Sequence, residues 1–148
     1  MLSENKYGFL LILDEKWWSR LCGQKLSCTR IQAFVRRGLV GPVATNKLLF
    51  YVKHPVKQVM GVADFVERVA GDIKELWDRY GAETCLKNID EYLAFLSGRK
   101  QATFIRFSNP RELKAPVPLE IAKRILGSPI LPRGGKYINF EAVNQLTV

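Results

Sequence analysis

The sequence predicts an α+β fold, in which a small mixed β-sheet or barrel is flanked by helices. Short apolar runs of strand length and capped amphipathic segments follow one another in the order strand, helix, basic region, two strands, two helices, strand, helix. This order lacks the regular alternation of a doubly wound parallel sheet. The 148 residues, 47% hydrophobic and 25% charged, suit one domain over residues 1–148 with a core of its own.

Strands are predicted where short runs are apolar or rich in β-branched and aromatic residues. These runs are residues 7–13, 48–53, 56–69 and 101–107. Residues 25–45, which contain the pairs Arg36-Arg37 and Gly41-Pro42, are predicted as a strand followed by a basic loop. Gly61 lies inside the third run and permits a bulge of the kind that small barrels need at their corners.

Helices are predicted where a capping residue precedes apolar residues at helical spacing. The starts are Asp14, Asp72, Asn88 and Pro118, and the matching stops are Gly23, Gly81, Gly98 and Gly127. Residues 128–148 are expected to form a C-terminal loop with one or two helical turns after Asn139. Trp17 and Trp18 share helical spacing with Leu21, a pattern more typical of core residues than of an exposed binding platform.

Positive charge is concentrated in one third of the chain. From Lys16 to Ala63 there are nine Lys and Arg residues and no Asp or Glu, whereas the other 14 basic residues are balanced by all 14 acidic ones. The formal net charge of +9 therefore arises from this acid-free segment. Such segregation favours a polyphosphate partner, although a solvated basic face is the alternative.

Several classes of protein are disfavoured by composition. No apolar run approaches the ~20 residues that cross a bilayer, and no secretory leader is apparent, so we expect a cytoplasmic protein without a membrane partner. The three cysteines lack C-x-x-C spacing, and His54 is the only histidine. We therefore expect neither a metal site nor a cofactor. The oligomeric state is not predicted by these features.

The most specific motif follows the first predicted helix and runs from Gly23 to Arg30. Gly23, Lys25 and Arg30 match the pattern G-x-K-x-x-E-x-R, with Cys28 in the position of the glutamate. Further along, the run LLFYVK, then His54-Pro55 and Gly61-Val-Ala63, follow in the order of barrel strands. In these features the sequence resembles the ASCH group of the PUA-like superfamily, over roughly residues 7–126.

This resemblance implies a PUA-like barrel with an open, basic cleft that holds RNA or, as in the related EVE group, a modified nucleobase. An RNA-binding module is therefore the preferred interpretation. The nucleic-acid-binding candidates are Lys25, Arg30, Arg36, Arg37, Tyr51 and Lys53. Guanidinium groups suit phosphate contacts, and Tyr51 is chosen over Phe50 to stack a base because its hydroxyl tolerates water. Lysines such as Lys53 that flank a strand also protect its edge, which is a competing explanation.

The resemblance also implies an enzymatic alternative, since some ASCH relatives hydrolyse acylated nucleosides or RNA. The candidate catalytic residues are Lys25 with Asp64 or Cys28. The missing glutamate disfavours catalysis, because general-base chemistry needs a placed carboxylate or histidine. Cys28 as a small buried side chain is the simpler explanation for that residue. A protein-interaction adaptor with a solvated basic face is the third interpretation, and it needs no cleft.

Overall fold

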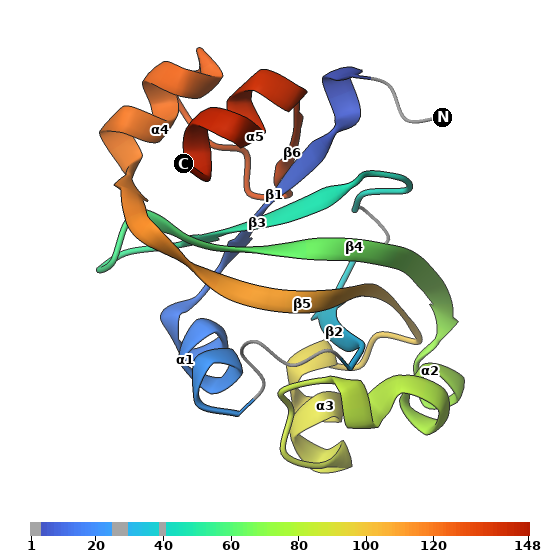
Figure 1. Ribbon diagram of the computed structural model, residues 1–148. Helices are drawn as coiled ribbons and strands as arrows, with labels where there is room; N and C mark the ends of the chain where they lie inside the picture. Colours follow the sequence, from blue (N-terminus) through green and yellow to red (C-terminus); the bar gives the residue numbers. More distant parts are fainter. Residues whose placement is uncertain (1–3, 25–29, 39–40) are drawn as a thin grey trace.

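The computed structural model describes residues 4–24, 30–38 and 41–148, and the described strands form one mixed sheet (Figure 1). The strands are β1 (Gly8–Leu13), β2 (Gln32–Arg36), β3 (Lys47–Val52), β4 (Gln58–Asp72), β5 (Gln101–Pro118) and β6 (Lys136–Ile138). They lie in the order β2-β5-β4-β3-β1-β6. The β1–β3 pair is parallel and the other pairs are antiparallel, which confirms the predicted α+β class.

The helices begin where the sequence predicts. They are α1 (Glu15–Gln24), α2 (Ile73–Tyr80), α3 (Ile89–Leu96), α4 (Leu119–Leu126) and α5 (Phe140–Leu146), with short 3-10 turns η1 (Glu4–Lys6) and η2 (Gly81–Glu83). Asp72 accepts hydrogen bonds from the backbone N–H groups of Lys74 and Glu75, and Asn88 accepts one from that of Glu91. These bonds satisfy N–H groups that have no partner inside the helix.

Two elements differ from the prediction. Strand β5 was expected to end at residue 107 but continues to Pro118, because β4 pairs with it along almost its whole length. Lys136–Ile138 was not predicted as a strand, yet it pairs antiparallel with β1 and forms one edge of the sheet. Both segments lack a strong apolar pattern, so tertiary pairing rather than local preference makes them extended.

The predicted bulge at Gly61 is confirmed. The register of β4 shifts against both neighbouring strands close to this residue, between Phe50 and Tyr51 of β3 and between Val59 and Gly61 of β4. A Cβ atom at position 61 would overlap the indole ring of Trp18. The glycine therefore lets the helix α1 pack directly against the bent strand.

Apolar side chains alternate along β3 and divide the core between the two faces of the sheet. Leu48, Phe50 and Val52 pack with Trp18 and Leu21 of α1. Leu49 and Tyr51 pack on the other face in a second cluster that includes residues of α4 and α5. A third cluster joins α2 and α3 to β2 and β5. Figure 1 shows α1, α2 and α3 on one side of the sheet and α4 and α5 on the other.

The described sheet is open, and a closed barrel is not confirmed, because the backbone pairing ends at β2 on one side and at β6 on the other. One side-chain bond nevertheless joins these two ends. Arg36, the last residue of β2, donates from Nη1 to the carbonyl oxygen of Gly134 at 2.9 Å, two residues before β6 begins. The backbone N–H of Val43 similarly donates to the hydroxyl of Tyr137 in β6 at 2.8 Å. Hydrogen bonds outside the strand ladder thus bring the two edges together.

Candidate nucleic-acid interface

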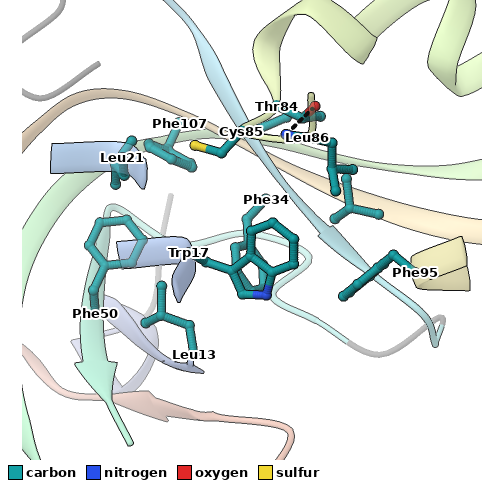
Figure 2. A pocket seen from close by; sticks show the side chains of 12 residues that line it. Leu13, Trp17, Leu21, Phe34, Phe50, Thr84, Cys85, Leu86, Phe95 and Phe107 are labelled. Carbon is teal, nitrogen blue, oxygen red and sulfur yellow. Dashed lines mark hydrogen bonds between the residues drawn. The ribbon is translucent and has the colours of Figure 1, made fainter. Parts of the chain in front are cut away.

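An aromatic cavity lies between helix α1, strand β2, helix α3 and the segment that follows η2 (Figure 2). Its wall consists almost entirely of hydrocarbon, including the rings of Trp17, Phe34, Phe50, Phe95 and Phe107. Trp17, Phe34 and Phe95 are half-buried, whereas Phe50 and Phe107 belong to the buried core. The outer part of the cavity is therefore lined by rings that reach the surface.

The hydroxyl of Thr84 in the cavity wall already has hydrogen-bond partners. It donates to the carbonyl oxygen of Gly81 at 2.8 Å and accepts from the backbone N–H of Leu86 at 3.3 Å. Beside it, Cys85 is half-buried. A ligand in this cavity would therefore be held by stacking and apolar contact rather than by hydrogen bonds from these side chains.

Cationic side chains surround the outer rings. The ammonium group of Lys16 lies 4.9 Å from the centroid of a Trp17 ring, and the guanidinium group of Arg20 lies 5.0 Å from it. Arg37 places its guanidinium group 4.5 Å from the ring centroid of Phe95 and donates from Nε to the Phe95 carbonyl oxygen at 2.7 Å. Arg20 is paired with Glu91, whereas Lys16 and Arg37 are exposed at the surface.

The pair of Arg20 and Glu91 fastens helix α1 to helix α3 across the cavity. Arg20 donates from Nη1 and Nη2 to the two carboxylate oxygens of Glu91 at 2.6 and 2.9 Å. These bonds, assisted by the backbone N–H of Lys87, lower the pKa of Glu91 to about 2. The bidentate geometry is the strongest form of an arginine–carboxylate contact, so the two walls of the cavity are held at a fixed separation.

Two of the predicted binding residues, Arg37 and Lys53, lie on the side of the sheet that carries α1. Arg37 belongs to the cavity rim, and Lys53 lies at the end of β3, where its Nζ is 3.0 Å from Oδ1 of Asp14 just before α1. Arg30 is exposed in the bend that precedes β2. The structure thus places these three cations near the ends of elements that also supply cavity residues.

Arg36 and Tyr51 are held in places that do not suit the roles predicted for them. Arg36 is half-buried and bonded to Gly134, and desolvation lowers its pKa. Tyr51 is only 6% exposed and packs beneath α4 and α5, where desolvation raises its pKa. Phe50 faces the core. The expectation that Tyr51 faces a cleft is wrong, because helices cover both faces of β3.

Asp64 is separated from the aromatic cavity by the sheet. Its Oδ1 is 2.6 Å from Nζ of Lys47, its direct partner in the β3–β4 ladder, and 3.5 Å from the guanidinium nitrogens of Arg111. Partial burial raises the pKa of Asp64, but the bonds from Lys47 and the charge of Arg111 outweigh it and leave the pKa below its usual value. Lys47 and Arg111 line a hollow beside α5, so Asp64 lies on that face.

Lys25 and Cys28, the two motif residues proposed for catalysis, lie outside the described residues. The carboxylate next to the end of α1 is that of Glu112 on β5, whose Oε1 lies 3.6 Å from the thiol of Cys22. Desolvation, together with the charge of Glu112, raises the pKa of the Cys22 thiol to about 11, so this cysteine is protonated at neutral pH. The linear sequence could not identify Glu112, because it lies 90 residues from Cys22 and is adjacent only through the sheet.

Sequence reasoning also missed the roles of Trp17 and Phe95. Trp18 is buried as expected, but Trp17 lines the cavity. On α3, Tyr92 and Leu96 are buried, whereas Ile89 and Leu93 are 41% and 44% exposed and Phe95 is half-buried at the cavity. The adjacent aromatic pair Trp17-Trp18 was a signal that one ring points away from the core.

Two further features bear on the class of protein. Among the described residues, no group of three or more His, Cys, Asp and Glu side chains is placed to hold a metal ion. None of the helices in the described part of the chain has the length and apolar character needed to span a membrane.

Comparison with known proteins supports the resemblance found in the sequence. No protein-family model matches the chain. A protein of Zymomonas mobilis subsp. mobilis named as an ASCH domain-containing ribonuclease is 28% identical over 111 residues, which are 75% of this chain and 74% of that protein.

Solved structures of ASCH from Zymomonas mobilis have the same fold. The crystal structure of that protein superposes with a TM-score of 0.77 at 23% identity and covers 95% of this chain and 94% of its own. A serine-to-alanine variant gives a TM-score of 0.78 at 22% identity, with 96% and 95% covered. A tyrosine-to-phenylalanine variant gives 0.77 at 22% identity, with 95% and 96% covered.

The mixed sheet with its flanking helices thus has the fold of these ASCH structures. The motif from Gly23 to Arg30, the order of the elements and the similarity to the Zymomonas mobilis protein agree with the resemblance to ASCH domains.

Proposed function

We propose that this ASCH-like domain binds single-stranded RNA, with one base stacked among the rings of the aromatic cavity and the adjoining phosphates held by cations at its rim. The observation that carries the proposal is the meeting of half-buried aromatic rings with exposed cations, since Lys16 and Arg37 lie directly against Trp17 and Phe95. Stacking on such rings together with phosphate contacts is the usual basis of single-strand binding.

Two further findings support RNA as the partner. The positive charge of the chain arises from the acid-free segment between Lys16 and Ala63, which includes α1 after its first residue, β2 and Arg37. The curated relative from Zymomonas mobilis is named as a ribonuclease. We propose that Arg37, Lys53 and Arg30 contact phosphates together with Lys25 of the motif, and that residues 1–148 act as one RNA-binding unit.

The structure modifies the predicted set of binding residues. Arg36 is engaged with Gly134, and Tyr51 is covered by α4 and α5, so we propose structural roles for both. Trp17, Phe34 and Phe95 take the stacking role instead, because they line the cavity and are half-buried. A modified nucleobase with extra apolar surface would suit the hydrocarbon wall equally well.

The test measures binding of a fluorescent single-stranded RNA oligonucleotide as a function of salt. With about three phosphates neutralised, the logarithm of the association constant should fall with that of the salt concentration at a slope of about −2. Phe95→Leu removes a ring but keeps the site apolar, and should weaken binding about tenfold, within the ~1–3 kcal/mol expected for a stacked base. Phe140→Leu, a ring on α5 at the opposite face, is the matched control and should leave affinity unchanged.

Absence of RNA binding at low salt would exclude this function. Equal effects of Phe95→Leu and Phe140→Leu would show that RNA binds elsewhere. The adaptor alternative uses the same surface without phosphate contacts. It would be favoured if the protein binds no RNA but binds an aromatic peptide with an affinity that does not change with salt.

A hydrolase acting on RNA or an acylated nucleoside is the second candidate, and the name of the curated relative favours it. Asp64 is held by Lys47 on the α5 face, so we propose Glu112, next to Cys22 at the end of α1, as the carboxylate that would serve with Lys25. Replacement of either residue, Glu112→Gln or Lys25→Ala, should then abolish turnover, and Glu112→Gln should leave RNA binding unchanged. Turnover that survives both replacements would exclude this catalytic pair.

A further inference from the structure

Arg37 holds Phe95 at the mouth of the aromatic cavity through two different contacts. Its Nε donates to the Phe95 carbonyl oxygen at 2.7 Å, and its guanidinium group lies 4.5 Å from the Phe95 ring centroid. The same ring meets Trp17 in an edge-to-face contact, with the centroids 5.7 Å apart and the planes at 90°. Phe95 thus closes against Trp17 (Figure 2). Arg37 contacts both the backbone and the ring of Phe95.

In this arrangement the cavity is too full for a nucleobase. Its free volume is about 40 Å³. A single water needs roughly 10–15 Å³ by that measure, so there is room for a few waters and not for an aromatic base. A base can enter only when one of the half-buried rings moves outward. Phe95 is the ring whose backbone and side chain are both contacted by one exposed arginine.

Arg37 is also the cation best suited to a phosphate at this mouth. It is exposed, and its neighbour Arg36 is turned to Gly134 instead. Arg20, the other guanidinium group near the rings, already binds both oxygens of Glu91. A phosphate is a stronger acceptor for a guanidinium group than a backbone carbonyl, because the bond is charge-assisted on both sides.

We infer that Arg37 is a specificity residue that admits a base to the cavity only when that base carries a phosphate. A phosphate that engages Arg37 draws its guanidinium group from Phe95, the released ring moves outward, and the attached base enters between the rings of Phe95 and Trp17. The ligand class is therefore a nucleotide, free or within RNA, and not a free nucleobase or nucleoside. This inference rests on the proposed RNA-binding function and specifies how its cavity opens.

The experiment compares adenosine with adenosine monophosphate by isothermal titration against the whole chain. The wild-type protein should bind the nucleotide at least tenfold more tightly than the nucleoside. Arg37→Gln removes both the restraint on Phe95 and the phosphate contact, so adenosine should bind threefold to tenfold more tightly and the preference for the nucleotide should nearly vanish. Arg37→Lys keeps the charge without the Nε bond; it should improve adenosine binding yet retain part of the preference.

Lys74→Gln removes an exposed charge on α2 and is the control for net charge. It should change neither the affinity for adenosine nor the preference for adenosine monophosphate. An unchanged preference in Arg37→Gln overturns the inference, and so does an equal loss of affinity for both ligands. Titration with the single-stranded RNA oligonucleotide separates the two proposals. If RNA binds at low salt but the preference for the nucleotide over the nucleoside is unchanged in Arg37→Gln, only the proposed role of Arg37 is excluded. If neither RNA nor nucleotide binds, the proposed function is excluded as well.

Discussion

Replacement of Arg106 by leucine should destabilise the protein and loosen one wall of the aromatic cavity. Arg106 on β5 donates from Nε and Nη2 to the two carboxylate oxygens of Glu83 at 2.9 and 2.8 Å. It also pairs with Glu67 of β4 and lies over the ring of Tyr80 at 4.4 Å. Because Glu83 directly precedes the cavity segment from Thr84 to Leu86, this arginine anchors that segment to the sheet.

The size of the expected loss of stability follows from how far Arg106 and Glu83 are exposed to water. The side chain of Arg106 is 13% exposed and that of Glu83 is 20% exposed, so the pair is largely but not fully removed from water. Loss of one partner of a fully buried pair costs about 3–5 kcal/mol, whereas an exposed pair contributes under about 1 kcal/mol. We therefore expect Arg106→Leu to lower the free energy of unfolding by about 2–3 kcal/mol. For a chain of this size that corresponds to a melting temperature lower by roughly 5–10 °C.

Urea unfolding followed by circular dichroism measures this change. With a slope of about 2 kcal/mol per molar urea, the midpoint should fall by about 1–1.5 M. The double variant Arg106→Leu/Glu83→Leu is the control, since it removes the carboxylate that the single variant leaves without its partner, and it should recover part of the loss. A midpoint shift under about 0.3 M for the single variant would refute the reasoning, because Arg106 would then behave as an ordinary surface residue.

Two other predictions concern pH and packing. The bond from Arg20 lowers the folded-state pKa of Glu91 from 4.5 to about 2, so the carboxylate stabilises the fold above about pH 4.5 and this contribution is lost as the pH falls toward 2. Glu91→Gln should therefore flatten the dependence of the urea midpoint on pH between these values. An unchanged pH profile would contradict the role given to the Arg20–Glu91 pair. Gly61→Ala would push a methyl group into the ring of Trp18. It should lower the free energy of unfolding by about 1–3 kcal/mol, measured by thermal denaturation. An unchanged free energy of unfolding would mean that α1 can move away from the strand.

Much of the architecture was accessible from local patterns. Asp72 and Asn88 cap helices because their side chains bond to nearby backbone N–H groups, an interaction that spans only three residues and leaves a readable signature. The bulge at Gly61 was likewise predicted from a single glycine in an apolar run. The second half of β5 was not, because its extended form depends on β4, which lies far away along the chain.

The candidate site was only partly predictable. Arg30, Arg37 and Lys53 were proposed from the charge of the segment, but the charge alone did not distinguish Arg37 at the cavity from Arg36 at the edge of the sheet. Tyr51 was chosen over Phe50 to stack a base because its hydroxyl tolerates water. Strand alternation shows only that the two neighbours face opposite ways, not which faces are covered, and here α4 and α5 cover the face of Tyr51.

The sequence by itself therefore determined the element types, the caps, the concentration of positive charge between Lys16 and Ala63, and the resemblance to ASCH domains. All of these depend on residues that are near one another along the chain. Only the tertiary structure decided that Trp17 and Phe95 meet across a cavity, that Arg37 holds one of these rings, and that Asp64 faces away from it. The physical reason is that such contacts join elements distant in sequence, and their geometry is set by how the helices pack on the two faces of the sheet.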